Sequence, residues 1–422
     1  MQFGWEMKQL FYNELLSIKT EINKLQQDKN NLKILGNIQE KLLEYHHWVE
    51  CKCNTRKIRL NTLKRIKKNP ANTKGISLQI KSSIDKNMVQ LDELKELKLW
   101  LRNIGNSLPH LYYDKGSLRA YSYSVNSDNL KELSGDIHGK DGLNLELKSF
   151  RYAIDNGSKA LLNDLTSIMR YGDLTLMDKE IPFIMEIKKS AACRVKANKQ
   201  LKSMQEIHSY LEKDVSTTLR GGGIISQRVT MSEDEKSNKE LFNKHFTDSK
   251  DTGYNFSKIE NGLYCLSFYN GSKYQDNVDL LVIRELKKPA FFSLNQFKNE
   301  EDNSLFYPYP LLIDDPEIYT AFMLDFYSIY LFFDCEILNE TAGNYKLEFS
   351  FITEKYLVEM RSKDGPLIYS HTFTKALVEF SSLNWAANQM FANYQIALDS
   401  YDAIIKKEFL INYNIGNTLS KG

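Results

Sequence analysis

The segment GDLTLMDKEIPFIMEIKKS at residues 172–190 constrains the fold of this 422-residue chain more than any other feature. Its first part, DLTLM at 173–177, alternates in the way a half-buried strand does, and PFIMEIK at 182–188 reads as a second strand. The four residues between them, DKEI, are left as a turn. The segment therefore predicts an antiparallel β-hairpin.

The register of this hairpin is expected to bring two carboxylates together. A pairing of Thr175 with Ile184 across the turn also pairs Asp173 with Glu186, with Cβ atoms about 4.5–5.5 Å apart. Like charges that face each other in a sheet are unfavourable. The arrangement is stable only with a shared proton, a nearby base or a bound cation.

Two predicted helices flank the hairpin and bring more polar side chains to the same end. A helix from about residue 147 to 169 would carry Asp164 towards the hairpin. A second helix, from about 192 to 211, would place Gln200 on the apolar stripe that packs on the sheet. A polar group on such a stripe needs a partner.

An Asp on one strand, Glu-x-Lys on the next and a Gln on the following helix together resemble the motif of the PD-(D/E)XK nuclease superfamily. Here the motif reads Gly172-Asp173 and then Glu186-Ile187-Lys188, with Gln200 on the helix and Gly in place of the Pro. The resemblance covers roughly residues 145 to 230. It implies an α/β, restriction-endonuclease-like core with the element order αβββαβ.

The resemblance also implies a metal site. Asp173, Glu186 and the backbone carbonyl of Ile187 would bind Mg²⁺, for which Mn²⁺ may substitute, and Asp164 would match an acidic residue that some members carry on the first helix. Mg²⁺ prefers oxygen ligands and takes only one or two protein carboxylates, with waters and phosphate oxygens completing its shell. A bound cation would also remove the repulsion expected in the hairpin.

The catalytic residues implied by the resemblance are Asp173, Glu186, Lys188 and Gln200. Lys188 would orient or help deprotonate the attacking water, and Gln200 would support Lys188 or the phosphate. The expected activity is Mg²⁺-dependent hydrolysis of DNA phosphodiesters, in the manner of an antiviral defence or restriction effector. The alternatives are an RNA-directed nuclease and a non-catalytic nucleic-acid-binding or assembly protein, in which Glu186 and Lys188 form only an ion pair.

The pattern of apolar and aromatic residues divides the chain into three predicted parts. Residues 1–110 carry helix-spaced apolar positions with a break at Asn69-Pro70, which predicts an antiparallel helical hairpin or small bundle that packs or forms a homo-oligomer. Residues 111–245 would form the nuclease-like domain. Aromatic apolar runs in residues 246–422 indicate an α+β domain, with a possible role in binding a partner protein.

The overall charge gives no argument for nucleic acid, because 56 Lys and Arg nearly balance 54 Asp and Glu. A local patch does: residues 51–84 contain ten positive charges and no acidic residue. We expect Lys64, Arg65, Lys67 and Lys68 of this run to contact the nucleic-acid backbone. The alternative is a solvated helix face.

The remaining features favour a cytoplasmic protein that does not enter a membrane. The start of the chain lacks a signal-peptide pattern, the five cysteines have no regular spacing, and the most apolar run, 326–333, is far shorter than the ~20 residues that span a bilayer. His46-His47 and Cys51-x-Cys53 lack the second pair of a structural zinc site. They are interpreted as a helix face.

Overall fold

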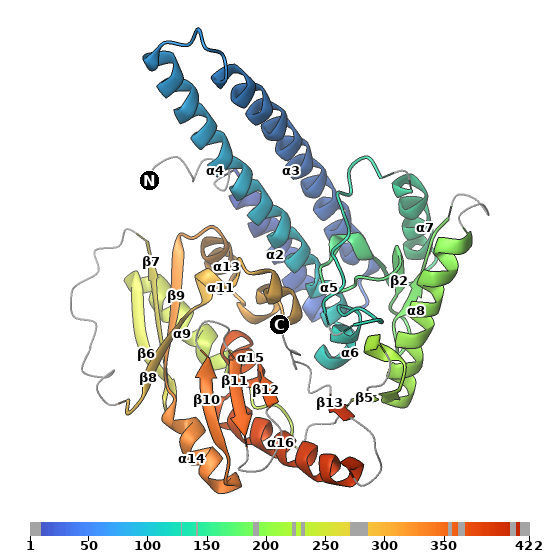
Figure 1. The fold of residues 1–422 in the computed structure, drawn as a ribbon, viewed down its shortest axis with the longest axis vertical. Coiled ribbons are helices and arrows are strands. Elements are labelled where there is room, and N and C mark those ends of the chain that lie inside the picture. Colours follow the sequence, from blue (N-terminus) through green and yellow to red (C-terminus); the bar gives the residue numbers. More distant parts are fainter. Residues whose placement is uncertain are drawn as a thin grey trace.

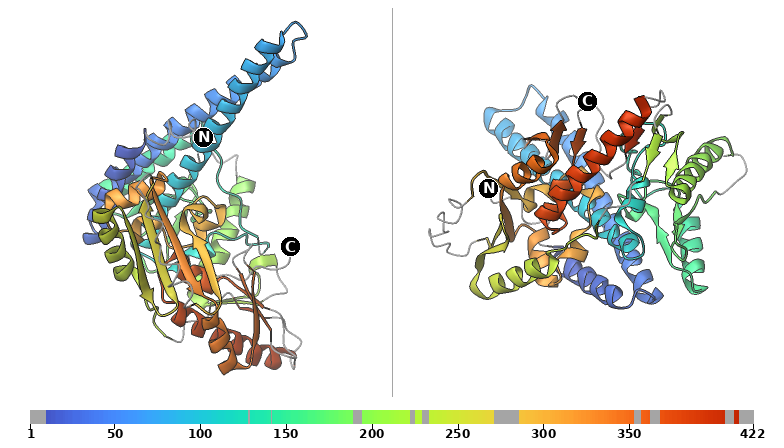
Figure 2. Two further views of the ribbon diagram at one scale, coloured as in Figure 1. Left: turned by 90° about the vertical axis from the view of Figure 1, so that its left-hand side faces the viewer. Right: turned by 90° about the horizontal axis from the view of Figure 1, so that it is seen from below.

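The computed structural model describes residues 10–127, 129–140, 142–188, 194–221, 225–228, 233–270, 286–352, 357–361, 368–405 and 411–413. Figures 1 and 2 show a helical hairpin that projects from a body of several small sheets and short helices. The chain is thus a mixed α/β protein. None of its helices in the described ranges is long and apolar enough to cross a membrane.

Three helices form the N-terminal part: α2 (Tyr12–Gln27), α3 (Leu32–Lys67) and α4 (Lys74–Gly105). The long pair α3 and α4 lie antiparallel, which confirms the predicted hairpin (Figure 1). Each long helix starts with a side-chain cap, because Asn31 accepts the N–H of Ile34 and Thr73 accepts that of Ile76. Pro70 lies in the short turn between them.

The predicted β-hairpin forms as strands β2 (Leu174–Leu176) and β3 (Phe183–Met185), with Thr175 paired to Ile184 as expected. A third strand, β1 (Ala160–Leu162), pairs antiparallel with β2 and completes a small sheet. The free edge of β1 is closed by a side chain of α3, because Gln39 donates to the carbonyl of Ala160 and accepts the N–H of Leu162, both at 2.8 Å.

The helix predicted over 147–169 is wrong in its second half. Helix α7 (Leu143–Asp155) ends early, and the chain then forms β1 and a 3-10 turn, η1 (Asn163–Leu165). Gly157, with φ +87°, lies between the helix and the strand and permits the change of direction. Asp164 therefore lies on the η1 turn rather than on a helix.

Helix α8 (Arg194–Lys213) matches the helix predicted after the hairpin. It leads to β4 (Val215–Ser216) and, after the 3-10 turn η3 (Leu219–Gly221), to β5 (Ile225–Gln227). Elements α7, β1, β2, β3, α8 and β4 thus follow one another in the order αβββαβ. Strand β4 does not join the β1–β3 sheet, however, and pairs with β5, which also pairs in parallel with β13 (Ile411–Tyr413).

The C-terminal part contains two more antiparallel sheets. The larger has the order β6-β7-β9-β8, with bounds Tyr254–Glu260, Leu263–Tyr269, Tyr327–Asp334 and Pro289–Ser293. The smaller joins β10 (Glu348–Ile352), β11 (Leu357–Arg361) and β12 (Ile368–Ser370). Strand β7 coincides with one of the aromatic apolar runs of this part of the sequence, and another such run, at residues 278–283, lies outside the described residues.

Helices accompany these sheets and link them to the rest of the molecule. Helix α9 packs on β6, α13 packs on β9 and on α2, and α14 and α15 both pack on α16. Their bounds are Lys239–Thr252 for α9, Pro316–Met323 for α13, Glu336–Tyr345 for α14, Thr372–Val378 for α15 and Leu383–Ile405 for α16. The shorter helices are α5 (Ser107–His110), α6 (Lys115–Ala120), α11 (Leu294–Phe297), η4 (Glu301–Leu305) and α12 (Tyr309–Leu312).

The three predicted parts share one hydrophobic core. The largest cluster of buried side chains is continuous in space. Its members lie between Phe11 and Tyr394 in the sequence and come from all three parts. Trp100 of α4 illustrates the join, since it is fully buried and its indole N–H donates to Asn299 at 2.8 Å. The base of the helical hairpin is therefore packed into the body of the molecule.

Candidate functional site

One cavity of about 860 Å³ is lined by every residue that the sequence assigned to catalysis or metal binding. These residues are Asp164, Asp173, Glu186, Ile187, Lys188 and Gln200. They come from the η1 turn, from both arms of the β2–β3 hairpin and from α8. The cavity therefore brings together six predicted residues that are up to 36 positions apart in the chain, from Asp164 to Gln200.

Asp173 is held at the end of β2 by the neighbouring strand. Its backbone N–H donates to the carbonyl of Met185 at 2.9 Å, and its Oδ2 accepts the N–H of Ile187 at 2.8 Å. The resemblance implied that the backbone carbonyl of Ile187 binds the metal ion. In the structure, the contact between Ile187 and Asp173 is made by the Ile187 N–H. The Asp173 carboxylate is thereby fixed above the start of the segment that carries Glu186.

Gly172 permits this close approach of the two strands. Its φ is +67°, a region that residues with a Cβ rarely adopt, and a Cβ at this position would lie 2.8 Å from the carbonyl oxygen of Met185. Glycine in place of the proline of the motif is thus required by the local backbone. It sets the position of the carboxylate that follows it.

Asn163 ties the η1 turn to the hairpin. Its backbone N–H donates to the carbonyl of Asp173 at 3.1 Å, and its side chain contacts the Thr175 hydroxyl at 2.7 Å and the Tyr171 carbonyl at 2.6 Å. Asp164 follows directly, so its carboxylate lies on the same side of the sheet as that of Asp173. The position of Asp164 is set by these hydrogen bonds rather than by a helix.

Lys140 is the site residue that the sequence analysis missed. Its ammonium group lies 3.0 Å from Glu146 Oε1, 2.8 Å from Asp164 Oδ2 and 3.2 Å from Asp173 Oδ1. Burial lowers the pKa of Lys140, but the carboxylates of Asp164 and Glu146 raise it by more, so the net pKa lies above its usual value. Lys140 comes from a loop that nothing in the local sequence pattern connects with the hairpin.

Glu186 contributes a different charge to the cavity. Its side chain is 5% exposed, and its Oε1 pairs with the ammonium group of Lys188. Its Oε2 is buried and has no hydrogen-bond partner among the described residues. An ionised carboxylate oxygen without a partner is costly to bury. The two carboxylates that were expected to repel each other therefore have separate cations, Lys140 for Asp173 and Lys188 for Glu186.

Two more cations line the cavity, Lys131 and Arg170. Burial lowers the pKa of Lys131, and the charge of Glu186 partly opposes this shift. Arg170 is 7% exposed, and its guanidinium donates to the Ser167 carbonyl at 2.8 Å and to the Ser304 hydroxyl at 3.1 Å. A cavity lined by both carboxylates and cations suits an anionic substrate held beside a metal ion.

The residues present fit a hard divalent cation in part. Asp173, Asp164 and Glu186 offer carboxylate oxygens, and the bare Oε2 of Glu186 is an acceptor that such an ion would satisfy. The oxygens of Asp164, Asp173 and Glu146 are spread around the Lys140 ammonium, and among the described side chains these three do not all approach within 4.8 Å of one another. Binding at this end thus requires Lys140 to move.

The predicted nucleic-acid contacts lie elsewhere. Lys64, Arg65, Lys67 and Lys68 are exposed at the far end of α3, in the projecting tip of the hairpin (Figure 1). They do not line the cavity. At 1.5 Å per residue, the end of the 36-residue helix α3 lies about 27 Å from its middle.

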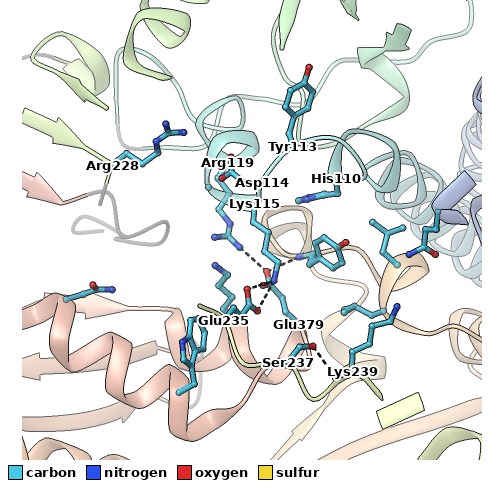
Figure 3. A pocket seen from close by; sticks show the side chains of 18 of the residues that line it. His110, Tyr113, Asp114, Lys115, Arg119, Arg228, Glu235, Ser237, Lys239 and Glu379 are labelled. Carbon is cyan, nitrogen blue, oxygen red and sulfur yellow. Dashed lines mark hydrogen bonds and ion pairs between the residues drawn. The ribbon is translucent and has the colours of Figure 1, made fainter. Parts of the chain in front are cut away.

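A second cavity, also of about 860 Å³, lies between α6 and α15 and carries a buried ion network (Figure 3). Glu379 is fully buried and pairs with Lys115 at 2.7 Å and with Arg119 at 2.9 Å. Lys115 also pairs with Glu235 at 2.9 Å. Each carboxylate of this network is matched by a cation, so its first role is to hold the central and C-terminal parts of the chain together.

Comparison of the chain with protein-family models, with curated proteins and with solved structures found no match in any of the three.

Proposed function

We propose that the cavity at the β2–β3 hairpin is the active site of a Mg²⁺-dependent nuclease that hydrolyses phosphodiester bonds in DNA. The observation that carries this proposal is the convergence of Asp164, Asp173, Glu186, Lys188 and Gln200 on one cavity. The motif was identified from local sequence alone, which does not determine that its residues share a cavity. A chance Glu-x-Lys on a surface strand would not be expected to share a cavity with two other acidic residues and a helix glutamine.

The chemistry expected at this site is metal-assisted hydrolysis. When bound, Mg²⁺ supplies a charge that polarises the scissile phosphate and lowers the pKa of a coordinated water. Asp173 and Glu186 would hold the ion, with Asp164 beside them. Hydrogen bonding of Asp173 Oδ2 to the Ile187 N–H fixes one carboxylate in advance, which reduces the cost of ordering the site.

The other residues of the cavity would act on the substrate. Lys188 would leave Glu186 to orient the attacking water or to stabilise charge that develops on the phosphate. Lys131 and Arg170, which also line the cavity, would supply positive charge to the phosphate backbone. Gln200 of α8 would contact Lys188 or the phosphate.

A second candidate function is favoured by Lys140. Its ammonium group meets three carboxylates at 2.8–3.2 Å, as a permanent internal cation would. In that case the fold would bind nucleic acid or a partner chain without cutting, and Lys140 would take the place of the metal. The two functions differ in whether Lys140 leaves the cluster when Mg²⁺ is present.

A cleavage assay tests the first function. Purified protein is incubated with supercoiled plasmid, linear DNA and RNA in Mg²⁺, Mn²⁺ or EDTA. We expect DNA cleavage with either metal and none in EDTA. Asp173→Ala and Glu186→Ala should abolish cleavage, whereas Asp92→Ala, which removes an exposed carboxylate of the helical hairpin, should leave it unchanged.

Three outcomes would count against this proposal. Full cleavage by both Asp173→Ala and Glu186→Ala would exclude the assigned site. Binding of DNA without cleavage in either metal would favour the non-catalytic function. Cleavage of RNA alone would keep the site and change the substrate.

A further inference from the structure

His47, Cys51 and His138 meet at the surface of α3. The sequence pattern around His47 and Cys51 was interpreted as a helix face because it lacks a second ligand pair, and His138 is a partner that this pattern does not reveal. His47 and Cys51 are four residues apart and share one face of the helix, and His138 comes from the loop between α6 and α7. One ligand atom of each lies within 4.8 Å of the other two. In the part of the chain that the structure describes, no other three His, Cys, Asp or Glu side chains meet as closely.

The loop that brings His138 to α3 is held there by buried contacts. The carboxylate of Glu50, only 1% exposed, accepts the N–H of Ile137 at 3.0 Å and that of His138 at 2.7 Å. Lys98 of α4 lies 3.0 Å from the same carboxylate and balances its charge. His138 is thus fixed beside Cys51 by a neighbouring residue of the same helix.

A second anchor fixes the preceding turn of this loop. Arg102 of α4 is 4% exposed, and it donates to the carbonyls of Ser134 at 2.7 Å and Gly135 at 2.8 Å. The backbone around His138 therefore has a defined place that does not depend on any ligand. Such preorganisation is the condition for a specific site on a surface.

The distances suit tetrahedral coordination. Zinc bond lengths of about 2.0–2.1 Å to nitrogen and 2.3 Å to sulfur place a nitrogen and a sulfur ligand about 3.6 Å apart. His47 Nε2 and Cys51 Sγ are 3.7 Å apart. The rings of His47 and His138 meet edge to face, with centroids 4.2 Å apart, and one nitrogen of each lies within 4.8 Å of the other ligand atoms.

We propose that His47, Cys51 and His138 bind one transition-metal ion, for which Zn²⁺ is the expected physiological metal. One thiolate and two imidazoles are soft to intermediate ligands, which select Zn²⁺ over Mg²⁺. Three protein ligands leave the fourth position to water or to an exchangeable ligand. The half-exposed Cys51 and the exposed histidines make the site accessible from solvent.

The site has a structural consequence for the cavity. Lys140 is two residues beyond His138, and its N–H donates to the carbonyl of Ile137 at 3.3 Å. An ion held by His138 would therefore cross-link α3 to the turn that delivers Lys140 to the carboxylates. Metal binding itself does not depend on the proposed nuclease activity; only an effect on cleavage rests on that function.

Cobalt titration of the full-length protein tests this site. Protein purified with a reductant and stripped with a chelator is titrated with Co²⁺. We expect one ion per chain, visible ligand-field bands of a tetrahedral site, a near-ultraviolet sulfur-to-cobalt band, and loss of all of them when Zn²⁺ is added. Metal content of untreated protein is measured in parallel by mass spectrometry.

Variants separate this site from other thiols and imidazoles. Cys51→Ser should remove the sulfur-to-cobalt band, and His47→Ala and His138→Ala should each weaken Co²⁺ binding at least tenfold. The matched controls are Cys335→Ser, another half-exposed free thiol, and His208→Ala, another histidine exposed on a helix. Both should bind Co²⁺ as the wild type does.

The outcomes are distinguishable from those of the cleavage assay. Absence of one-to-one binding by the wild type, or a sulfur-to-cobalt band that survives Cys51→Ser, overturns the proposal. Far-ultraviolet circular dichroism is recorded for each variant, and we expect all of them to be folded because the three side chains lie at the surface. A protein that binds Co²⁺ at this site but does not cut DNA refutes the nuclease alone, and one that cuts without binding refutes the metal site alone.

Discussion

Lys140 donates a hydrogen bond of 2.8 Å to Asp164, which lies 24 positions further along the chain. This ion pair links the loop that carries Lys140 to the η1 turn that carries Asp164. The Lys140 side chain is 31% exposed, whereas those of Asp164 and Asp173 are 15% and 12% exposed. The cation can therefore swing out to water more easily than the carboxylates can. A divalent ion and Lys140 are rivals for the same oxygens.

This rivalry predicts the effect of Lys140→Met. Without metal, the variant leaves Glu146, Asp164 and Asp173 without their cation and should lose up to about 3 kcal/mol of unfolding free energy. Mg²⁺ should restore most of that loss and should bind more tightly than to the wild type, because no ammonium group competes. The measurement is the melting temperature as a function of Mg²⁺ concentration.

The control for this measurement is Lys95→Met. Lys95 pairs with Asp92 on the exposed face of α4, with side chains 61% and 64% exposed, so its loss should cost 0–1 kcal/mol and should not alter the Mg²⁺ response. An equal Mg²⁺ response of both variants and the wild type would mean that the cluster does not bind the ion.

A second prediction concerns Gly172→Ala. An added Cβ would meet the Met185 carbonyl at 2.8 Å in a backbone region that alanine rarely adopts, so the hairpin must open. We expect a loss of more than ~2 kcal/mol from backbone strain and displaced pairing. Gly139→Ala is the matched control, because its φ is also positive, at +80°, but an added Cβ meets nothing within 4 Å. Urea unfolding of the two variants isolates the cost of the contact, and equal midpoints would refute this role of Gly172.

A third prediction concerns acid. Burial lowers the pKa of His110 to about 3, that of His245 to about 4 and that of His46 well below its usual value. In the unfolded chain each titrates near 6.5, so between about pH 6 and 4 the unfolded state binds more protons and stability falls as the pH falls. Each buried histidine contributes about 1.4 kcal/mol per pH unit within that window.

His46→Leu tests this slope. Neither ring nitrogen of His46 has a hydrogen-bond partner among the described residues, so the substitution removes a titrating group without breaking a bond. The variant should lose less stability than the wild type between pH 6.5 and 5, measured by urea unfolding at each pH.

The sequence predicted the parts of this site that depend on local pattern. Strand alternation gave the register that pairs Thr175 with Ile184, and helix spacing put Gln200 on the inner face of α8. What it missed depends on long-range contacts. Lys140 reaches Asp173 across 33 residues, and His138 reaches α3 because Glu50 accepts its N–H, and no periodicity encodes either contact.

The prediction that a helix carries Asp164 was wrong for a related reason. Leu161, Leu162 and Leu165 are spaced as they would be on a helix, but the segment is buried on all sides. Gln39 supplies hydrogen bonds that suit a strand. A continuous apolar run of this length does not distinguish a buried helix from a buried strand. The hydrogen bonds from Gln39 of α3 favour the strand over the helix.

A fourth prediction concerns the basic tip of the helical hairpin. Neutralising Lys64, Arg65, Lys67 and Lys68 to Gln should weaken DNA binding and flatten its salt dependence, because fewer counterions are released. The tip is remote from the cavity, so cleavage at saturating DNA should not change. Fluorescence anisotropy at several salt concentrations measures the slope. An unchanged slope would leave the tip as a solvated helix end.

The last prediction concerns the ion network of the second cavity. Burial raises the pKa of Glu379, but Lys115, Lys375 and Arg119 lower it more, and the net pKa is about 2. Because this lies below the usual value of about 4.3, the carboxylate stabilises the fold at neutral pH and loses that contribution only as the pH falls through about 4 to 2. At pH 7 its contribution is therefore fully present.

Glu379→Gln should accordingly be costly at neutral pH. The substitution keeps the shape of the side chain but leaves Arg119, 4% exposed, and Lys115 without their buried anion, and we expect a loss of about 3–5 kcal/mol. Glu340→Gln breaks an exposed pair with Lys287 and should leave the stability almost unchanged. Guanidinium unfolding at pH 7 compares the two variants. Because Glu379 follows α15 and pairs with Lys115 and Arg119 of α6, its loss should loosen the contact between the two helices. Equal stability of both variants would show that the network does not hold the two parts together.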